Sequence, residues 1–158
     1  LAHLGARVAL SDAARAHCLA RLHTPVPCVA LGLALRGLAT SAIDVSDGLV
    51  ADIGHIGERS GVAVELRYAD VPRSLALEGC ADERLAQTCM LAGGDDYELV
   101  FTAAPDSREK VAAVAVELGL ALTRIGSVIA GEAGRVSVYA AAGMIMPIAS
   151  KGFDHFGG

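Results

Sequence analysis

Residues 42–66 read AIDVSDGLVADIGHIGERSGVAVEL, and this stretch decides the fold class. The apolar run over 41–45 predicts a strand at the start of this stretch. A polar Ser-Asp-Gly triplet at 46–48 ends that run and is suited to capping a helix. Residues 48–60 then carry apolar side chains at helical spacing, and residues 62–66 alternate as a second strand. A strand, a helix and a strand are therefore expected in succession.

The helix expected over 48–60 has one apolar face. We expect that face to bury three side chains: Leu49, Ile53 and Ile56. Three charged side chains are placed outside it: Asp52, Glu58 and Arg59. Gly61 follows the last helical residue, and glycine commonly stands where a helix ends.

The flanking segments add further elements of both kinds. Apolar spacing predicts helices over 11–22, 29–38, 75–77, 83–91 and 107–118. Alternating apolar residues predict strands over 97–103, 120–129 and 136–139. We therefore predict an α+β fold in which a mixed β-sheet packs against helices.

Length and composition predict one domain, residues 1–158, with a single hydrophobic core. Apolar residues make up 53% of the chain and aromatic residues only 4%, so this core is expected to be aliphatic. The net charge is -5 and the basic residues are scattered, which argues against a nucleic-acid partner. The opening residues lack a basic leader, a membrane-spanning length and a cleavage signature, so we expect a cytoplasmic protein with no membrane partner.

Three polar residues stand where the first strand gives way to the helix: Asp44, Ser46 and Asp47. Backbone N–H groups at a helix start are unpaired and lie at the positive end of the helix dipole, so a phosphate group is able to bind there. Two carboxylates three residues apart are also able to converge on Mg²⁺, which takes oxygen ligands. The alternative is that Ser46 or Asp47 only caps the helix and Asp44 only stabilises a turn, which is the commoner use of such residues.

A second polar cluster, Gly-Gly-Asp-Asp at 93–96, precedes the strand at 97–103. Glycines let a backbone approach a ligand closely, and carboxylates accept hydrogen bonds from it. The alternative is a polar turn at the entrance to the strand. His55 has Asp52 one turn before it and Arg59 one turn after it, so we expect an ion-paired surface histidine.

Three stretches together resemble thiamine-monophosphate kinase, a family of the aminoimidazole-ribotide-synthetase-like superfamily. They are AIDVSDGLVADIGHIGERSGVAVEL at 42–66, LAGGDDYELVFTA at 91–103 and KGFDHFGG at 151–158. Segment 21–39 is also similar to the family segment that precedes the first stretch, so the resemblance covers nearly the whole chain. The resemblance implies the fold of the carboxy-terminal domain of this superfamily.

The resemblance implies an enzyme that transfers the γ-phosphoryl group of ATP to thiamine monophosphate, with Mg²⁺ ions between the protein and the phosphates. By the same resemblance Asp44 and Asp47 are Mg²⁺ ligands and Ser46 contacts ATP. Asp95 and Phe153 occupy positions that contact the thiamine substrate. Catalysis would then rest on positioning and charge neutralisation, with no covalent intermediate.

The chain departs from the family at two positions. Asp95 stands where the family usually has Glu, and the shorter side chain is expected to reach the substrate through a water molecule. Cys28 stands where the family often has arginine.

The resemblance also implies an amino-terminal domain that supplies most of the metal-binding aspartates and the core of a homodimer. The chain begins at Leu1 within a helical pattern and lacks that domain, so we expect a fragment without measurable kinase activity alone. Two alternatives stay open. One is another ATP-dependent superfamily enzyme with a different phosphoryl acceptor, and the other is a non-catalytic assembly module with an exposed apolar patch within residues 1–38.

Overall fold

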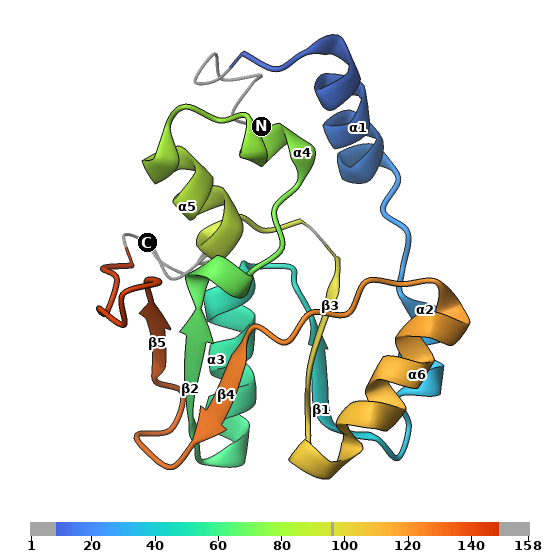
Figure 1. Ribbon diagram of the computed structural model, residues 1–158, viewed down its shortest axis with the longest axis vertical. Coiled ribbons are helices and arrows are strands. Elements are labelled where there is room, and N and C mark those ends of the chain that lie inside the picture. Colours follow the sequence, from blue (N-terminus) through green and yellow to red (C-terminus); the bar gives the residue numbers. More distant parts are fainter. Residues whose placement is uncertain (1–8, 96, 149–158) are drawn as a thin grey trace, which may run out of the picture.

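The computed structural model describes residues 9–95 and 97–148, in which helices and strands are interspersed along the chain (Figure 1). The helices are α1 (Asp12–His23), α2 (Val29–Ala34), α3 (Leu49–Ser60), α4 (Leu75–Glu78), α5 (Glu83–Ala92) and α6 (Arg108–Leu118). Two 3₁₀ turns are η1 (Tyr68–Asp70) and η2 (Pro105–Ser107). The strands are β1 (Ala39–Asp44), β2 (Ala63–Arg67), β3 (Leu99–Ala103), β4 (Gly126–Ile129) and β5 (Val136–Tyr139). The predicted α+β class is confirmed.

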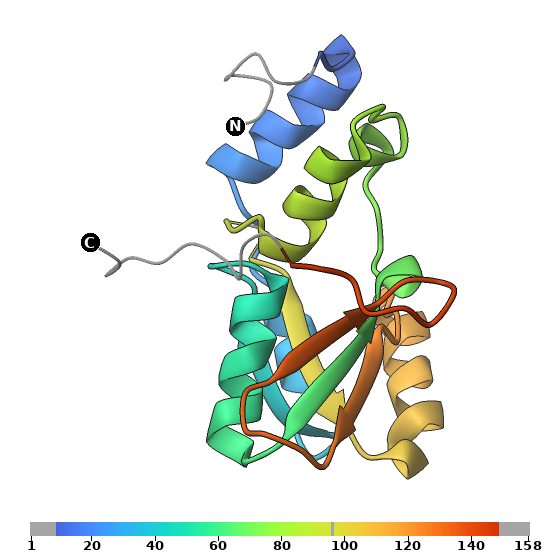
Figure 2. The same cartoon turned by 90° about the vertical axis from the view of Figure 1, so that its left-hand side faces the viewer.

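The strands form two sheets. β2 lies between β4, which runs antiparallel to it, and β5, which runs parallel to it, so this sheet is mixed as predicted. β1 and β3 form a separate antiparallel pair. Figure 2 shows α3 on one side of the strands and α6 on the other. In the described residues no helix has both the length and the apolar character needed to cross a membrane.

The buried apolar side chains form two clusters, so the expectation of a single core is wrong. The larger cluster involves α3, α5 and the three-stranded sheet, and the smaller one is built on Leu31, Leu35 and Val114 of the α2–α6 region. Val100 of β3 belongs to the larger cluster, whereas its neighbour Phe101 packs against the smaller one. Successive side chains of a strand point to opposite faces, so the β1–β3 pair separates the two cores.

Helix α3 begins and ends close to the predicted residues, but one of its side chains lies elsewhere than expected. Gly61 has a φ of 67° and ends the helix in the left-handed conformation, as predicted. Asp52 is only 2% exposed, so its placement outside the buried face is wrong. Glu58 and Arg59 are exposed, as expected.

Two predicted elements are shorter in the structure because of their neighbours. α2 ends at Ala34 instead of continuing to residue 38, and Gly37 with a φ of 78° turns the chain toward β1. β4 begins at Gly126 rather than residue 120. Gly126 pairs with Leu66, and only Arg67 of β2 lies beyond that pair. The N–H of Arg67 donates to the Ile125 carbonyl at 2.8 Å, and the chain then leaves the sheet in η1.

Candidate functional site

The junction between β1 and α3 carries the three residues predicted for metal and nucleotide binding. Asp44 ends β1 with an exposed side chain, while Ser46 and Asp47 are half-buried in the loop that follows. Gly48 stands directly before α3 with a φ of 126°, a conformation that side chains rarely adopt. A Cβ atom there would lie 3.0 Å from the Ala92 backbone, so the loop packs closely against the end of α5.

Asp52, which the sequence analysis did not assign to the site, organises this loop. Its carboxylate bends back over the start of α3, where the Oδ2 atom accepts hydrogen bonds from three backbone N–H groups. The donors are Ser46 at 3.0 Å, Asp47 at 3.1 Å and Gly48 at 3.1 Å. Consecutive N–H groups that point at one position form an anion-binding nest, and here the anion is a side chain of the protein itself. The expectation that these N–H groups are unpaired and open to a phosphate is therefore wrong.

The spacing of α3 contains the signal that would have identified Asp52. Leu49, Asp52, Ile53 and Ile56 follow the i, i+3, i+4, i+7 pattern of one helix face. A carboxylate on a buried face requires hydrogen-bond partners, and the nearest unpaired donors are those at the start of the same helix.

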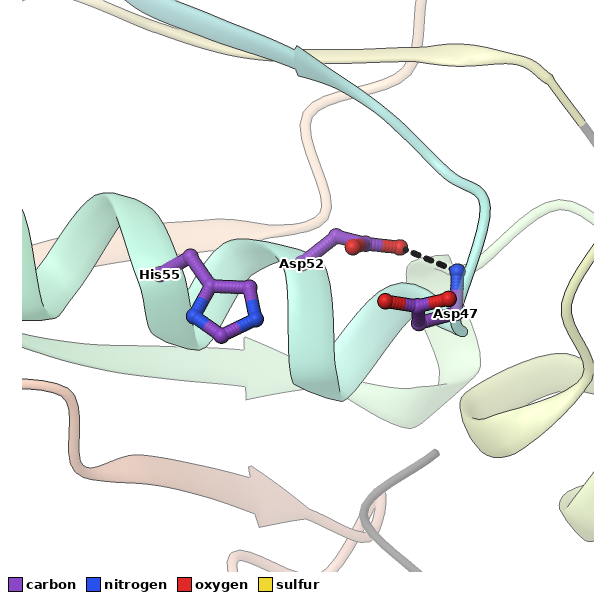
Figure 3. Close-up of side chains that lie close together, drawn as sticks. All are labelled: Asp47, Asp52 and His55. Carbon is purple, nitrogen blue, oxygen red and sulfur yellow. Dashed lines mark hydrogen bonds between the residues drawn. The ribbon is translucent and has the colours of Figure 1, made fainter. Parts of the chain in front are cut away.

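Three side chains at this junction could share a metal ion: Asp47, Asp52 and His55 (Figure 3). One ligand atom from each lies within 4.8 Å of the others, and no other such group of three is found in the part of the chain that the structure describes. Carboxylate oxygens suit hard cations such as Mg²⁺, whereas an imidazole suits transition metals. Asp44, predicted as a ligand together with Asp47, is not part of this group.

His55 is a paired surface residue, as predicted, although its partner is a different one. Its Nδ1 atom lies 3.2 Å from Oε2 of Glu58, and both side chains are exposed. The histidine therefore faces solvent at the edge of the acidic pair formed by Asp47 and Asp52.

The loop that precedes β3 lies directly against the β1–α3 junction. The N–H of Asp95 donates to the Ser46 carbonyl at 2.9 Å, and the N–H of Tyr97 donates to the Val45 carbonyl at 2.9 Å. In return the N–H of Val45 donates to the Glu98 carbonyl at 2.8 Å. These bonds continue the β1–β3 pairing beyond the ends of both strands, and they bring the two predicted polar clusters together.

Gly94 makes this close approach possible. A Cβ atom at this position would overlap with the carbonyl oxygen of Ser46. Gly94 thus permits a close backbone approach to the first polar loop, and the predicted approach to a ligand stays a prediction. Asp95 and Tyr97 have positive φ values of 65° and 52°, and the Tyr97 hydroxyl donates to Asp95 Oδ1 at 3.4 Å. The Asp95 side chain is exposed, while Asp96 and the predicted substrate contact Phe153 lie outside the described residues.

A mostly apolar cleft of about 350 Å³ adjoins the same junction. It is lined by Pro27, Cys28, Val29, Gly32, Asp44, Tyr97 and Leu99. Cys28 donates to Glu98 Oε2 at 3.7 Å, and Arg21 binds the other carboxylate oxygen of Glu98. Burial and the negative charge of Glu98 raise the pKa of the Cys28 thiol. Cys28, at the position where the resemblance implies that arginine often stands, therefore lines this cleft as a neutral thiol.

Comparison with known proteins places the chain in a family. Residues 6–139 match the family described as AIR synthase related protein, C-terminal domain. This chain belongs to that family. The resemblance to thiamine-monophosphate kinases within it is confirmed by the relatives and solved structures that the chain matches.

Among curated relatives, the thiamine-monophosphate kinase of Salmonella typhimurium is 38% identical over 157 residues, which are 99% of this chain and 48% of the relative. The enzyme of Haemophilus influenzae is 39% identical over 134 residues, which are 84% of this chain and 40% of the relative. The chain therefore spans about half the length of the curated relatives that it matches.

Solved structures agree with this family assignment. Thiamine-monophosphate kinase from Stenotrophomonas maltophilia superposes with a TM-score of 0.75 at 44% identity, covering 85% of this chain and 42% of that one. A structure described as AaThiL complexed with AMPPCP and TMP superposes with a TM-score of 0.70 at 27% identity, covering 97% of this chain and 45% of that one. Escherichia coli HypE, a hydrogenase maturation protein, shares only the fold, with a TM-score of 0.65 at 19% identity.

Proposed function

We propose that this chain is the carboxy-terminal part of a thiamine-monophosphate kinase, which phosphorylates thiamine monophosphate to thiamine diphosphate with ATP. The observation that carries the proposal is the backbone contact between residues 45–46 and 95–98. It gathers the positions implied for metal, nucleotide and substrate in a chain that is 38% identical to these kinases over nearly its whole length. The neighbour described as complexed with AMPPCP and TMP supports the same assignment.

The residues at the junction fit a hard cation. Asp47 and Asp52 offer carboxylate oxygens close together, and Asp44 offers an exposed carboxylate at the end of β1. Oxygen ligands of this kind are the ones that Mg²⁺ prefers. Asp44 and Asp47 would hold the ions, and bound Mg²⁺ would neutralise charge on the phosphates.

The protein's own part in the reaction would be positioning. The Ser46 hydroxyl would donate a hydrogen bond to a phosphate oxygen of ATP. Asp95 would reach the thiamine substrate through a water molecule, with Phe153 as a second substrate contact. A phosphate oxygen of thiamine monophosphate would attack the γ-phosphorus of ATP, the bond between that phosphorus and the β–γ bridging oxygen would break, and ADP would leave.

We propose further that the activity requires the part of the relatives that this chain does not span. The chain corresponds to 48% of the Salmonella relative, and only the acidic group at the α3 junction is found in the described residues. The chain alone is therefore expected to be inactive. A homodimer of the full-length enzyme and a cytoplasmic location remain predictions.

An assay for thiamine diphosphate tests this function. The chain is mixed with the separately expressed amino-terminal half of a related kinase, together with thiamine monophosphate, ATP and Mg²⁺. We expect product only when both pieces are present, and we expect Asp47→Asn to abolish it. Product formed by the chain alone would contradict the expected inactivity, and no product from folded, associated pieces would contradict the kinase assignment.

One observation favours a second candidate, the non-catalytic assembly module. Val26 before α2 is 64% exposed, and Val29 and Leu33 within α2 are 61% and 60% exposed. Apolar side chains are therefore displayed within residues 1–38, where this candidate places its patch. Association with the amino-terminal half that is unaffected by Mg²⁺ and by Asp47→Asn, with no product, would support the module over the kinase.

A further inference from the structure

The buried carboxylate at the start of α3 has a role that the proposed function does not include. We propose that Asp52 is a positioning residue. By filling the amide nest of residues 46–48, it fixes this loop and makes the junction a site for cations rather than for free anions. The inference rests on the proposed function only for the identity of the cation.

The geometry of the nest carries the first step. Three consecutive N–H groups point at a single oxygen of Asp52, at 3.0–3.1 Å, at the start of a helix. An empty nest at a helix start attracts phosphate or another anion, because both the N–H groups and the helix dipole favour negative charge. With the Asp52 carboxylate in place, this attraction is satisfied internally, and the carboxylate repels a second anion.

The second step concerns Asp47, which contributes both its backbone N–H and its carboxylate to this site. Its backbone N–H donates to Asp52 at 3.1 Å, while its carboxylate lies beside that of Asp52 (Figure 3). The bond therefore fixes the main chain from which the Asp47 carboxylate projects. A fixed main chain at Asp47 reduces the rearrangement that the loop needs when a cation binds.

The loop of residues 46–48 also has contacts that do not involve Asp52, and these would remain if Asp52 were replaced. The Ser46 carbonyl accepts from the N–H of Asp95 at 2.9 Å, and Gly48 packs against the backbone of Ala92. Removal of the Asp52 carboxylate would free the three N–H groups while these other contacts keep the loop near its place. The same change should therefore weaken cation binding and strengthen anion binding.

The test measures two ligands separately on the 158-residue chain, with Mn²⁺ alone and inorganic phosphate alone as probes. Paramagnetic broadening of amide resonances reports Mn²⁺, and chemical-shift changes at residues 46–48 report phosphate. For Asp52→Ala we expect Mn²⁺ affinity to fall about 10- to 100-fold, the usual loss when a residue that orients metal ligands is removed. We expect phosphate affinity to rise in the same variant. A purely structural role would lower both affinities together.

Matched variants keep the test decisive. Asp82→Ala removes an exposed aspartate that caps α5, with the same change of net charge, and is expected to alter neither affinity. Asp52→Asn keeps an oxygen for the N–H groups, so it remains usable if Asp52→Ala does not fold, and we expect the same two changes at smaller size. Unchanged Mn²⁺ affinity, or phosphate affinity that does not rise, in the folded Asp52 variant would overturn the proposal.

Failure of the proposed function would be seen in a different measurement. No thiamine diphosphate from the combined pieces, with opposite shifts of Mn²⁺ and phosphate affinity still present, would leave Asp52 as a positioning residue of a different cation-binding protein. A wild-type chain whose residues 44–55 show no broadening by Mn²⁺ would overturn the cation part of the inference directly.

Discussion

An aspartate carboxylate accepts backbone hydrogen bonds near the start of both α3 and α5. The carboxylate at α5 stabilises the helix itself, whereas the carboxylate at α3 stabilises the loop before the helix. Asp82 is the residue directly before α5; it is exposed and accepts one hydrogen bond, from the N–H of Leu85 at 3.0 Å. Asp52 lies inside α3, is 2% exposed, and accepts three hydrogen bonds from the loop before the helix. A carboxylate ahead of a helix caps that helix, whereas one within its first turns can reach back and hold the preceding loop.

The largest effect that follows from this comparison is expected for Asp52→Ala. The substitution leaves three N–H groups in a largely buried region without their acceptor, so we expect a loss of about 3 kcal/mol in the free energy of unfolding. Urea unfolding measures this loss. Asp52→Asn, which keeps an acceptor oxygen, should lose less, and a loss for Asp52→Ala no larger than that for Asp82→Ala would abolish the distinction between the two carboxylates.

The next effect concerns Gly94, a support of the α3 loop that has no counterpart at the start of α5. In Gly94→Ala the new methyl group would overlap with the Ser46 carbonyl oxygen, so we expect destabilisation by about 1–3 kcal/mol, as for other overpacked sites. Thermal unfolding measures it. Gly32→Ala is the control, because a Cβ atom there meets no atom within 4 Å and alanine favours the helix. Equal stability of the two variants would show that the loop moves to accommodate the methyl group without any loss in the free energy of unfolding.

A smaller effect is expected for Asp82→Ala. Loss of a single exposed cap should cost about 1 kcal/mol, because one N–H group returns to water. Hydrogen exchange should accelerate at the Leu85 amide while the amides of residues 46–48 stay protected. Faster exchange at both places would mean that α5 and the α3 loop open as one unit.

The smallest effect is expected from Glu83, the first residue of α5. Hydrogen bonds from Arg73 and then Tyr68 lower the pKa of its carboxyl below the ordinary 4.5. Because the folded pKa is the lower one, the stabilisation is present above the unfolded value and is lost as the pH falls through the folded value. Solvent screens this exposed group, so the contribution is small and should shrink further in high salt.

Glu83→Gln should remove that contribution to the pH dependence. The comparison is the change in Tm of wild type and variant between about pH 6 and about pH 3, where such a carboxyl titrates. Glu78→Gln, which removes another exposed carboxyl nearby in the sequence, serves as the control. A Glu83→Gln variant that loses as much Tm as wild type over this range would show that the Arg73 contact adds nothing to stability.

Elements with strong local signals were predictable from the sequence. α3 was expected over 48–60 and forms over Leu49–Ser60, because the polar triplet before it, its apolar spacing and Gly61 after it all act within the segment itself. The burial of Asp52 does not follow from its charge, which is typical of an exposed position. Its place in the helical pattern, three residues after Leu49 and four before Ile56, indicates the buried face instead.

Features that depend on pairing between segments far apart in the sequence could not be predicted from the spacing of apolar residues. The division into two cores arises because β3 returns beside β1 with α2 and α6 on its outer face, and nothing local to Val100 or Phe101 specifies this. The meeting of Ser46 with Asp95 depends on the same pairing of segments about fifty residues apart along the chain. The family resemblance does assign Ser46 and Asp95 to one functional site, but it does not predict the backbone contact between them.

The three hydrogen bonds between residues 45–46 and 95–98 join main chain to main chain. Such bonds do not depend on side-chain identity, so the contact between the loops requires only that Gly94 stays without a side chain. Neither loop, however, is a transplantable module. A designer who wished to move this site into another scaffold would have to transfer both loops together with β1 and β3. Each loop is held in place by the other and by the pairing of these two strands.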